Sequence, residues 1–315
     1  MLCERATARP PWLDDLAVEF RYCDAAGLAD AVRGARALML WDFFSTAVRD
    51  VWEQAGTLEW IHVTAAGVDT LLFDELRDSD VVVTNACGVF DRPIAEYVLG
   101  AVLAYAKDSR FSLELQQRHS WQHRETRSIL GAKALVVGTG GIGRETARLL
   151  RVAGLEVRGV GRVARTGDPN FGDVIASSDL AAEVGWADHL VLAAPLTAAT
   201  RGLVDGQVLA AMKSDSHLVN VARGPLVDET ALLDALRAGL IGGATLDVFD
   251  REPLPPEHPL WDAPGITITA HMSGDVIGWR DTLAKQFAAN VRRWLAGEPL
   301  QNVVDKKLGY ISGER

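Results

Sequence analysis

A glycine-rich turn directly follows a run of apolar residues near the middle of the chain. The run Ala134–Val137 has the composition of a buried strand, and GTGGIG at 138–143 fits the pattern GxGxxG. The glycines of this pattern make the turn tight, let the backbone approach a diphosphate and let the next helix, here 144–152, pack on the strand. A purely structural glycine turn is the alternative. The sequence predicts a dinucleotide site at Gly138, Gly140, Gly141, Ile142 and Gly143.

Further apolar runs of strand length lie on both sides of this turn. Those after it span residues 156–160, 189–193, 217–221, 244–249 and 266–269. With the first run they make six strands, which helix-sized stretches separate, and this alternation predicts a doubly wound parallel sheet. Those before it span residues 18–22, 37–41, 60–63 and 81–83. The expected fold is α/β, with two Rossmann-like or flavodoxin-like domains, parallel sheets and a cleft between them.

The length of the chain also favours two domains, because 315 residues exceed what one hydrophobic core usually organises. Pro93 suits the first turn of a helix from residue 94 to about 117, which would carry the chain into the second domain. A later helix at 279–295 is expected to precede a return to the first domain. We predict a substrate-binding domain of residues 1–92 plus 283–315 and a dinucleotide-binding domain of residues 93–282.

Composition excludes several classes of function. The net charge of −10 and the scattered basic residues argue against nucleic acid and against an anionic membrane surface as partners. Cys3, Cys23 and Cys87 are odd in number and widely spaced, which predicts reduced thiols and no structural disulfide or metal site. The first residues carry charge and proline where a signal peptide needs an apolar stretch. We expect a cytoplasmic protein without a membrane span.

The end of the second strand bears on the choice of cofactor. A site that prefers NAD usually has Asp or Glu there, about twenty residues past the first glycines. Gly161 occupies this place, and Arg162, with Arg165 close behind, could meet a 2′-phosphate. This pattern predicts a preference for NADP(H), with NAD(H) still possible. The alternative is that Arg162 is a solvated loop charge and that Asp168 supplies the acid.

Three polar residues follow the later strands: Arg223, Glu252 and His271. In a parallel sheet these ends face the ligand crevice. Reduction of a carbonyl beside a carboxylate needs a cation for the carboxylate, an acid for the carbonyl oxygen and a group that keeps the acid charged. Arginine, histidine and glutamate supply these functions. Each residue alone could be a helix-end charge, a solvated acid or a core histidine; their joint position favours catalysis.

These motifs resemble the D-isomer-specific 2-hydroxyacid dehydrogenase family over residues 60 to about 304. Besides the glycine turn, the matching segments are APLT at 194–197, TRGL at 200–203, NVARGPLVDE at 220–229, LDVF at 246–249, EPLP at 252–255 and HMSG at 271–274. The resemblance implies that Arg223 binds the substrate carboxylate, that His271 donates the proton and that Glu252 is its partner. It further implies cofactor contacts from Pro195, Thr200, Val221, Asp247 and Ser273, with Asp247 at the nicotinamide carboxamide.

Two further segments take their meaning from the resemblance. The turn at 64–69 is similar to the family's substrate loop, so amides at Ala66, Gly67 and Val68 would help to hold the carboxylate. An ordinary strand-to-helix turn is the alternative. The polar stretch at about 111–130 is similar to the family's dimerisation arm, which implies a homodimer.

Departures from the pattern narrow the expected activity. Glu252 stands where formate dehydrogenases of the family have glutamine, whereas phosphoglycerate dehydrogenases usually accept NAD and often carry further domains beyond the point where this chain ends. Gly161-Arg162 resembles the glyoxylate/hydroxypyruvate reductases. We therefore expect reversible, NAD(P)H-dependent reduction of a small 2-keto acid to the D-2-hydroxy acid. A non-metabolic NAD(H)-binding corepressor of the same fold is the alternative. The candidates for the side-chain pocket are Trp41, Phe43, Phe44 and Phe90, which could equally belong to the core.

Overall fold

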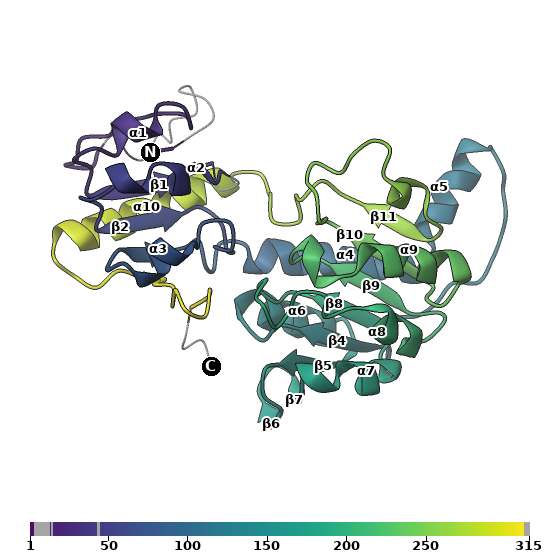
Figure 1. The fold of residues 1–315 in the computed structure, drawn as a ribbon. Helices are drawn as coiled ribbons and strands as arrows, with labels where there is room; N and C mark the ends of the chain where they lie inside the picture. The colour runs from purple at the N-terminus through teal and green to yellow at the C-terminus, as the bar shows by residue number, and fades with distance from the viewer. Residues whose placement is uncertain (3–12, 14, 43–44, 312–315) are drawn as a thin grey trace. The chain divides into compact units, whose positions relative to one another are not determined.

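The computed structural model describes residues 1–2, 13, 15–42 and 45–311; Cys3, Phe43 and Phe44 lie outside them. The chain divides into two compact units (Figure 1). One unit combines Met1–Phe90 with Val276–Arg315, and the other is Asp91–Asp275. Each unit contains a sheet of parallel strands with helices, which confirms the predicted α/β fold class.

The unit Asp91–Asp275 contains an eight-stranded sheet in the order β11-β10-β9-β8-β4-β5-β7-β6. Its strands are β4 Lys133–Val137, β5 Glu156–Gly161, β6 Arg165–Asp168, β7 Gly172–Ala176, β8 His189–Leu192, β9 His217–Asn220, β10 Gly243–Leu246 and β11 Ile266–Ile268. All neighbours pair in parallel except β6 with β7. Strands β8, β9 and β10 are buried along their whole length, which explains their continuous apolar runs.

Helices and short 3-10 turns connect these strands. They are α4 Asp91–Ala106, α5 Ser109–Gln117, α6 Gly141–Val152, η3 Ser177–Asp179, α7 Leu180–Glu183, η4 Val184–Trp186, α8 Gly206–Ala211, η5 Gly224–Leu226, α9 Glu229–Ala238 and η6 Pro259–Asp262. Helix α9 begins where the Asp228 side chain accepts the Ala231 amide at 2.9 Å, and it ends at Gly239, whose φ is 67°. In the part of the chain that the structure describes, no helix has the length and apolar character that a membrane span needs.

The discontinuous unit contains three parallel strands in the order β1-β2-β3. Its elements are α1 Leu28–Ala31, β1 Ala37–Leu40, α2 Ala47–Asp50, η2 Trp52–Gln54, β2 Trp60–Val63, α3 Asp74–Asp78, β3 Val82–Thr84 and α10 Trp279–Leu295. Helix α10 packs on the sheet through Phe287, whose ring centroid lies 5.3 Å from that of the buried Trp60. The last segment of the chain therefore contributes to the core of this unit.

Three expectations about secondary structure were wrong. Residues 18–22 form no strand; only an isolated bridge pairs Cys23 with Leu2. The helix expected at 94–117 breaks between α4 and α5, where Asp108 has a φ of 48°. The sheet also contains β6 and β7, which the sequence did not predict because their residues carry only a short apolar run at 174–176.

Candidate active site

The glycine turn has the geometry that a diphosphate site requires. A Cβ on Gly143 would lie 1.9 Å from the Gly138 carbonyl oxygen, and a Cβ on Gly138, whose φ is 106°, would lie 2.5 Å from the Ala193 carbonyl oxygen. By contrast, a Cβ on Gly140 would meet nothing within 4 Å, so this side of the turn is open. Helix α6 begins at Gly141, and its first amides lack partners within the helix. The turn therefore fits a dinucleotide. It follows β4, next to β8, and the strand order reverses between these two strands.

Two arginines, Arg144 of α6 and Arg165 of β6, share the carboxylate of Asp168. The Asp168 carboxylate lies 2.8 Å from the Arg165 guanidinium and 3.7 Å from that of Arg144. Burial alone would raise the pKa of Asp168, but the bond from Arg165 and two backbone amides hold that pKa below its ordinary value. Arg165 and Asp168 are therefore engaged with each other. Arg162, next to Gly161, is exposed, and its side chain makes no hydrogen bond or ion pair with the residues described.

The three polar residues predicted at strand ends come from neighbouring loops. Arg223 follows β9, Glu252 follows β10 and His271 follows β11, and these three strands are adjacent in the sheet. The pairing is parallel, so the loops leave the sheet at one edge. The structure thus brings these residues to one region of the unit Asp91–Asp275.

Glu252 and His271 form a direct pair. The His271 Nδ1 atom lies 2.7 Å from Glu252 Oε2, and each side chain is 27% exposed. The other carboxylate oxygen, Oε1, accepts the Phe249 amide at 2.9 Å. Burial alone would raise the pKa of Glu252, but these two hydrogen bonds and the charges of His271 and Arg223 lower it. Glu252 is thus held as a carboxylate that fixes the His271 ring through its Nδ1 atom.

A buried carboxylate braces the loop that carries His271. His271 has a φ of 50°, in the left-handed region, and its amide donates to the Asp247 carbonyl at 2.8 Å. The Asp247 carboxylate accepts the Met272 and Ser273 amides, each at 2.9 Å, and the Thr269 hydroxyl at 2.5 Å. Asp247 is completely buried. In this structure, therefore, Asp247 fixes the unusual backbone of the loop; its predicted contact with nicotinamide stays a prediction.

Arg223 is half-buried and extends from an ordered turn. Its guanidinium donates to the Ala222 carbonyl at 2.8 Å, and the Asn220 side-chain amide donates to the Arg223 carbonyl at 3.0 Å. The next residue, Gly224, lies against the loop after β10, because a Cβ there would be 1.9 Å from the Phe249 carbonyl carbon. The segments of Arg223 and Glu252 are thus in backbone contact.

Two other predicted cofactor residues close a turn after β8. The Thr200 hydroxyl donates to the Pro195 carbonyl at 2.7 Å and accepts the Thr197 amide at 2.8 Å. Val221 and Ser273 are nearly buried, at 6% and 8% exposure. Thr200 follows β8, Val221 follows β9 and Ser273 follows β11. All three residues therefore lie at the edge of the sheet from which the loops of Arg223, Glu252 and His271 leave.

The predicted substrate loop belongs to the other unit and follows β2. Residues 66 and 67 are half-exposed and Val68 is buried. Asn85, 4% exposed, holds this loop: its side-chain amide donates to the Ala66 carbonyl at 2.6 Å, and its oxygen accepts the Cys87 amide at 3.2 Å. The sequence analysis missed Asn85. Its position directly after a strand was the available signal.

Sequence reasoning also missed a second glutamate–histidine pair, Glu229 with His258. Their side chains approach to 3.5 Å. Both residues lie inside or beside the recognised motifs, but 29 positions separate them in the chain (258 − 229). No periodic pattern joins them, so only the tertiary structure could show the pair.

Comparison with known proteins identifies the family. The model of the NAD binding domain of D-isomer specific 2-hydroxyacid dehydrogenases matches residues 99–273. The chain is 34% identical to the (S)-sulfolactate dehydrogenase of Chromohalobacter salexigens over 86% of this chain and 88% of that protein. The matched domain and the solved relatives below indicate that the cofactor is a nicotinamide dinucleotide.

Solved structures with the same fold support this assignment. A D-isomer specific 2-hydroxyacid dehydrogenase of Xanthobacter autotrophicus, in complex with NADPH and MES, is 34% identical with a TM-score of 0.76, over 89% of this chain and 86% of that one. The NADPH-dependent glyoxylate/hydroxypyruvate reductase of Sinorhizobium meliloti, in complex with NADP and sulfate, is 27% identical with a TM-score of 0.78, over 92% of both chains. The family predicted from the sequence is thus confirmed: the chain belongs to the D-isomer specific 2-hydroxyacid dehydrogenases and is an oxidoreductase acting on CH–OH groups.

Proposed function

We propose that the protein reduces a small 2-keto acid to the D-2-hydroxy acid with NAD(P)H, reversibly. The observation that carries this proposal is the 2.7 Å contact between His271 and Glu252, on a loop beside that of Arg223. A histidine held by a carboxylate can donate a proton to a carbonyl oxygen near neutral pH. Arginine beside it can bind a carboxylate through two parallel hydrogen bonds.

In this mechanism each side chain has one task. Arg223 binds the substrate carboxylate and so orients the neighbouring carbonyl, together with amides at Ala66, Gly67 and Val68. His271 donates its Nε2 proton to the carbonyl oxygen, while Glu252, bonded to Nδ1, stabilises the charged ring. When bound, a nicotinamide dinucleotide would supply the hydride. The residues that would hold its diphosphate are Gly138, Gly140, Gly141, Ile142 and Gly143. Those that would line the rest of its site are Pro195, Thr200, Val221, Asp247 and Ser273.

The direct test is a panel of 2-keto acids assayed with both NADPH and NADH. The panel contains glyoxylate, hydroxypyruvate, pyruvate, branched and aromatic 2-keto acids, and 3-sulfopyruvate, which is the keto acid corresponding to the sulfolactate of one relative. Oxidation of either cofactor that depends on one of these acids supports the proposal. If none of them is turned over by the purified protein, the proposed reaction is wrong.

We propose NADP(H) as the preferred cofactor. Gly161 offers no carboxylate at the end of β5, and Asp168 is occupied by Arg165 and Arg144. Arg162 is therefore the exposed cation best placed by sequence for a 2′-phosphate, whereas Arg165 can assist only in part. Both of the solved relatives described above contain this phosphorylated cofactor, as NADPH in one and NADP in the other.

Arg162→Ala is expected to raise the KM for NADPH by about tenfold or more and to leave the KM for NADH within about twofold, since a charged hydrogen bond is worth about 1.5–3 kcal/mol. Steady-state kinetics with both cofactors measure the difference. Arg237→Ala, which removes an exposed arginine from the last turn of α9, is the control. Equal effects of Arg162→Ala on both cofactors would exclude the 2′-phosphate contact.

We also propose that the arm at about 111–130 forms a homodimer. Large apolar side chains are exposed along it: Trp121 at 100%, Leu130 at 78% and Leu113 at 60%. Such exposure is typical of an interface. Light scattering should give twice the chain mass of 34.0 kDa, and Trp121→Ser should shift the protein towards the monomer. A wild-type mass of one chain would contradict the proposal.

A further inference from the structure

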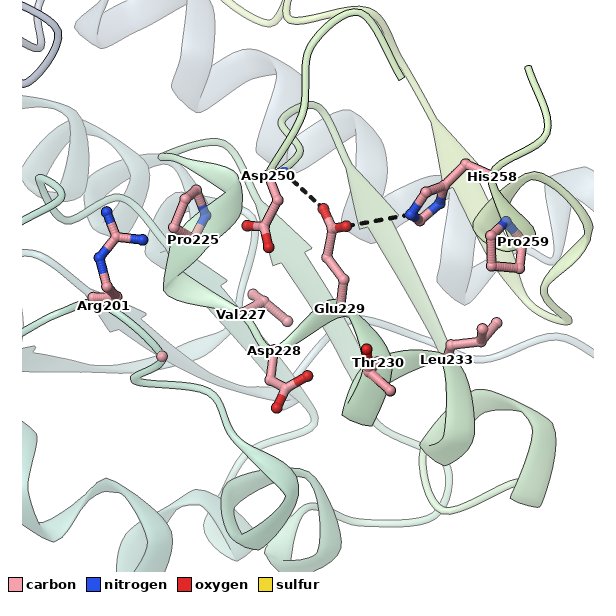
Figure 2. A pocket seen from close by; sticks show the side chains of 11 residues that line it. Arg201, Pro225, Val227, Asp228, Glu229, Thr230, Leu233, Asp250, His258 and Pro259 are labelled. Carbon is pink, nitrogen blue, oxygen red and sulfur yellow. Dashed lines mark hydrogen bonds and ion pairs between the residues drawn. The ribbon is translucent and has the colours of Figure 1, made fainter. Parts of the chain in front are cut away.

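Two glutamate–histidine pairs bind two consecutive backbone amides of the loop after β10. In the first, Glu252 Oε1 accepts the Phe249 amide and Oε2 contacts His271. In the second, Glu229 Oε1 accepts the Asp250 amide at 2.8 Å and Oε2 lies 3.5 Å from His258 Nε2 (Figure 2). Each carboxylate thus divides its two oxygens between a histidine and one of two consecutive amides.

The second pair is itself fixed to the fold. Glu229 is the first residue of α9, and its side chain is only 14% exposed. His258 caps the N-terminus of η6, where its Nδ1 atom accepts the Leu260 amide at 3.4 Å, so that Nε2 carries the proton toward Glu229. Two separate elements therefore hold the Glu229 carboxylate against the Asp250 amide.

On its other side, the peptide between Phe249 and Asp250 packs closely against Gly224. A Cβ on Gly224 would lie 1.9 Å from the Phe249 carbonyl carbon and 2.2 Å from the Asp250 nitrogen. The peptide between Phe249 and Asp250 is thus enclosed by the Arg223–Gly224 segment and bonded to Glu229. Its position sets the direction of the Phe249 amide, and that amide binds Glu252.

We propose that Glu229 is a positioning residue for the reaction: through the Asp250 amide it fixes the loop of Glu252, and so the contact between Glu252 and His271. Glu229 touches neither substrate nor cofactor in this role. His258 supports it as the partner that orients its carboxylate. The inference rests on the proposed function of His271 and Glu252.

Charged side chains surround Glu229 in a pocket of the unit Asp91–Asp275. It lines a pocket of about 330 Å³, which Figure 2 shows, together with Arg201, Asp228, Asp250 and His258. Burial raises the pKa of Glu229, and the nearby charges of Asp250 and Glu252 raise it further, whereas the Asp250 amide and His258 oppose this. Burial likewise raises the pKa of Asp250, near Arg201, Asp228 and His258. Three carboxylates, those of Glu229, Asp228 and Asp250, thus share this pocket with the Arg201 guanidinium and the His258 ring.

The first readout is the proton resonance of the Nδ1–H group shared by His271 and Glu252. A histidine N–H bonded to a carboxylate gives a far-downfield signal, because the hydrogen bond is charge-assisted. Its absence from His271→Asn and Glu252→Gln assigns the signal. We expect it to be lost or moved upfield in Glu229→Ala. We expect it unchanged in Glu229→Gln, which still offers an oxygen to the Asp250 amide, and in Asp234→Asn, which removes an exposed acid from the same helix.

The second readout is a double-mutant cycle on kcat. Glu229→Ala should lower kcat about tenfold with little change in the KM for the cofactor, and it should have no further effect in a Glu252→Gln background. If Glu229→Ala does not fold, His258→Asn replaces it. Asparagine can still cap η6 but cannot reach Glu229, so the signal and kcat should again fall.

Three outcomes would overturn the inference. One is an unchanged downfield signal in both Glu229→Ala and His258→Asn. Another is an equal change in Glu229→Gln, which would assign the effect to charge rather than to the hydrogen bond. The last is an undiminished loss of kcat in the Glu252→Gln background. Because the proton spectrum needs no substrate, failure of this inference is distinguishable from failure to reduce 2-keto acids.

Discussion

Replacing His271 with asparagine is expected to lower kcat about 10²-fold or more, the usual contribution of a positioned general acid. Asparagine suits this test because it tolerates the left-handed backbone of residue 271, where φ is 50°. The loop should therefore keep its bonds to Asp247, and only the proton donor is removed. Steady-state kinetics on the best acid of the panel measure the loss.

The matched control is His123→Asn, which changes an exposed histidine of the polar arm. It should leave kcat unchanged. The binding of NADPH, followed by its fluorescence, should be nearly the same in His271→Asn as in the wild type, because histidine acts on the carbonyl. Turnover of His271→Asn near the wild-type level would remove this residue from the mechanism.

The free energy of unfolding is expected to fall steeply as the pH drops below about 6.5. Three buried histidines each have a ring nitrogen without a hydrogen-bond partner among the residues described: His62, His189 and His217. Burial lowers the pKa of His62 to about 3 and that of His189 to about 4, and it lowers the pKa of His217 well below 6.5. These rings are neutral in the folded protein and become charged on unfolding in acid.

Proton linkage determines the direction in which the free energy of unfolding changes with pH. Between pH 6.5 and the folded pKa values, the unfolded chain binds more protons than the folded one, so stability is complete above pH 6.5 and declines below it. Each such histidine lowers the free energy of unfolding by up to about 1.4 kcal/mol for each pH unit below 6.5. Over two units, three of them approach the whole stability of an ordinary domain, about 5–15 kcal/mol. The unit Asp91–Asp275, with two of the three, should lose more than the other.

Urea unfolding from pH 8 to pH 4.5 measures this decline. His217→Phe is the informative variant, because phenylalanine can keep the stacking on Tyr105, whose ring centroid lies 4.3 Å away, but cannot take up a proton. Its free energy of unfolding should depend less steeply on pH than that of the wild type, whatever its value at pH 8. His123→Asn again serves as the control. Equal pH dependence of wild type and His217→Phe would contradict the assignment.

Sequence reasoning succeeded where a local pattern carried the structure. Strands β4, β8 and β9 are apolar runs with clear ends, and the polar residues after β9, β10 and β11 could be predicted to meet because parallel strands share an edge. The contact between His271 and Glu252 at 2.7 Å agrees with the pairing expected from the family resemblance.

The predictions of secondary structure failed where the fold depends on contacts between residues that lie far apart in the sequence. The sequence does not reveal the helix break at Asp108, because lysine and aspartate at 107–108 are compatible with a continuing helix. In the structure Asp108 has a left-handed backbone, and Arg124 of the arm donates hydrogen bonds to both its carbonyl and its carboxylate. The strand expected at 18–22 has apolar residues at alternate positions, but among the residues that the structure describes it has no partner strand. By contrast, the ion pair of Arg165 with Asp168 joins the two ends of β6, a strand that the sequence did not predict.

The order of the strands has an evolutionary consequence. The glycine turn and Arg162 follow β4 and β5 on one side of β8, whereas Arg223, Glu252 and His271 follow β9, β10 and β11 on the other side. The segments that would select the electron donor thus share no loop with those that would protonate the substrate. Substitutions in the segments after β4 and β5 can therefore change the preferred nicotinamide cofactor while Arg223, Glu252 and His271 stay the same. Proteins with this sheet can thus evolve a new cofactor preference without a change in the residues that protonate the substrate.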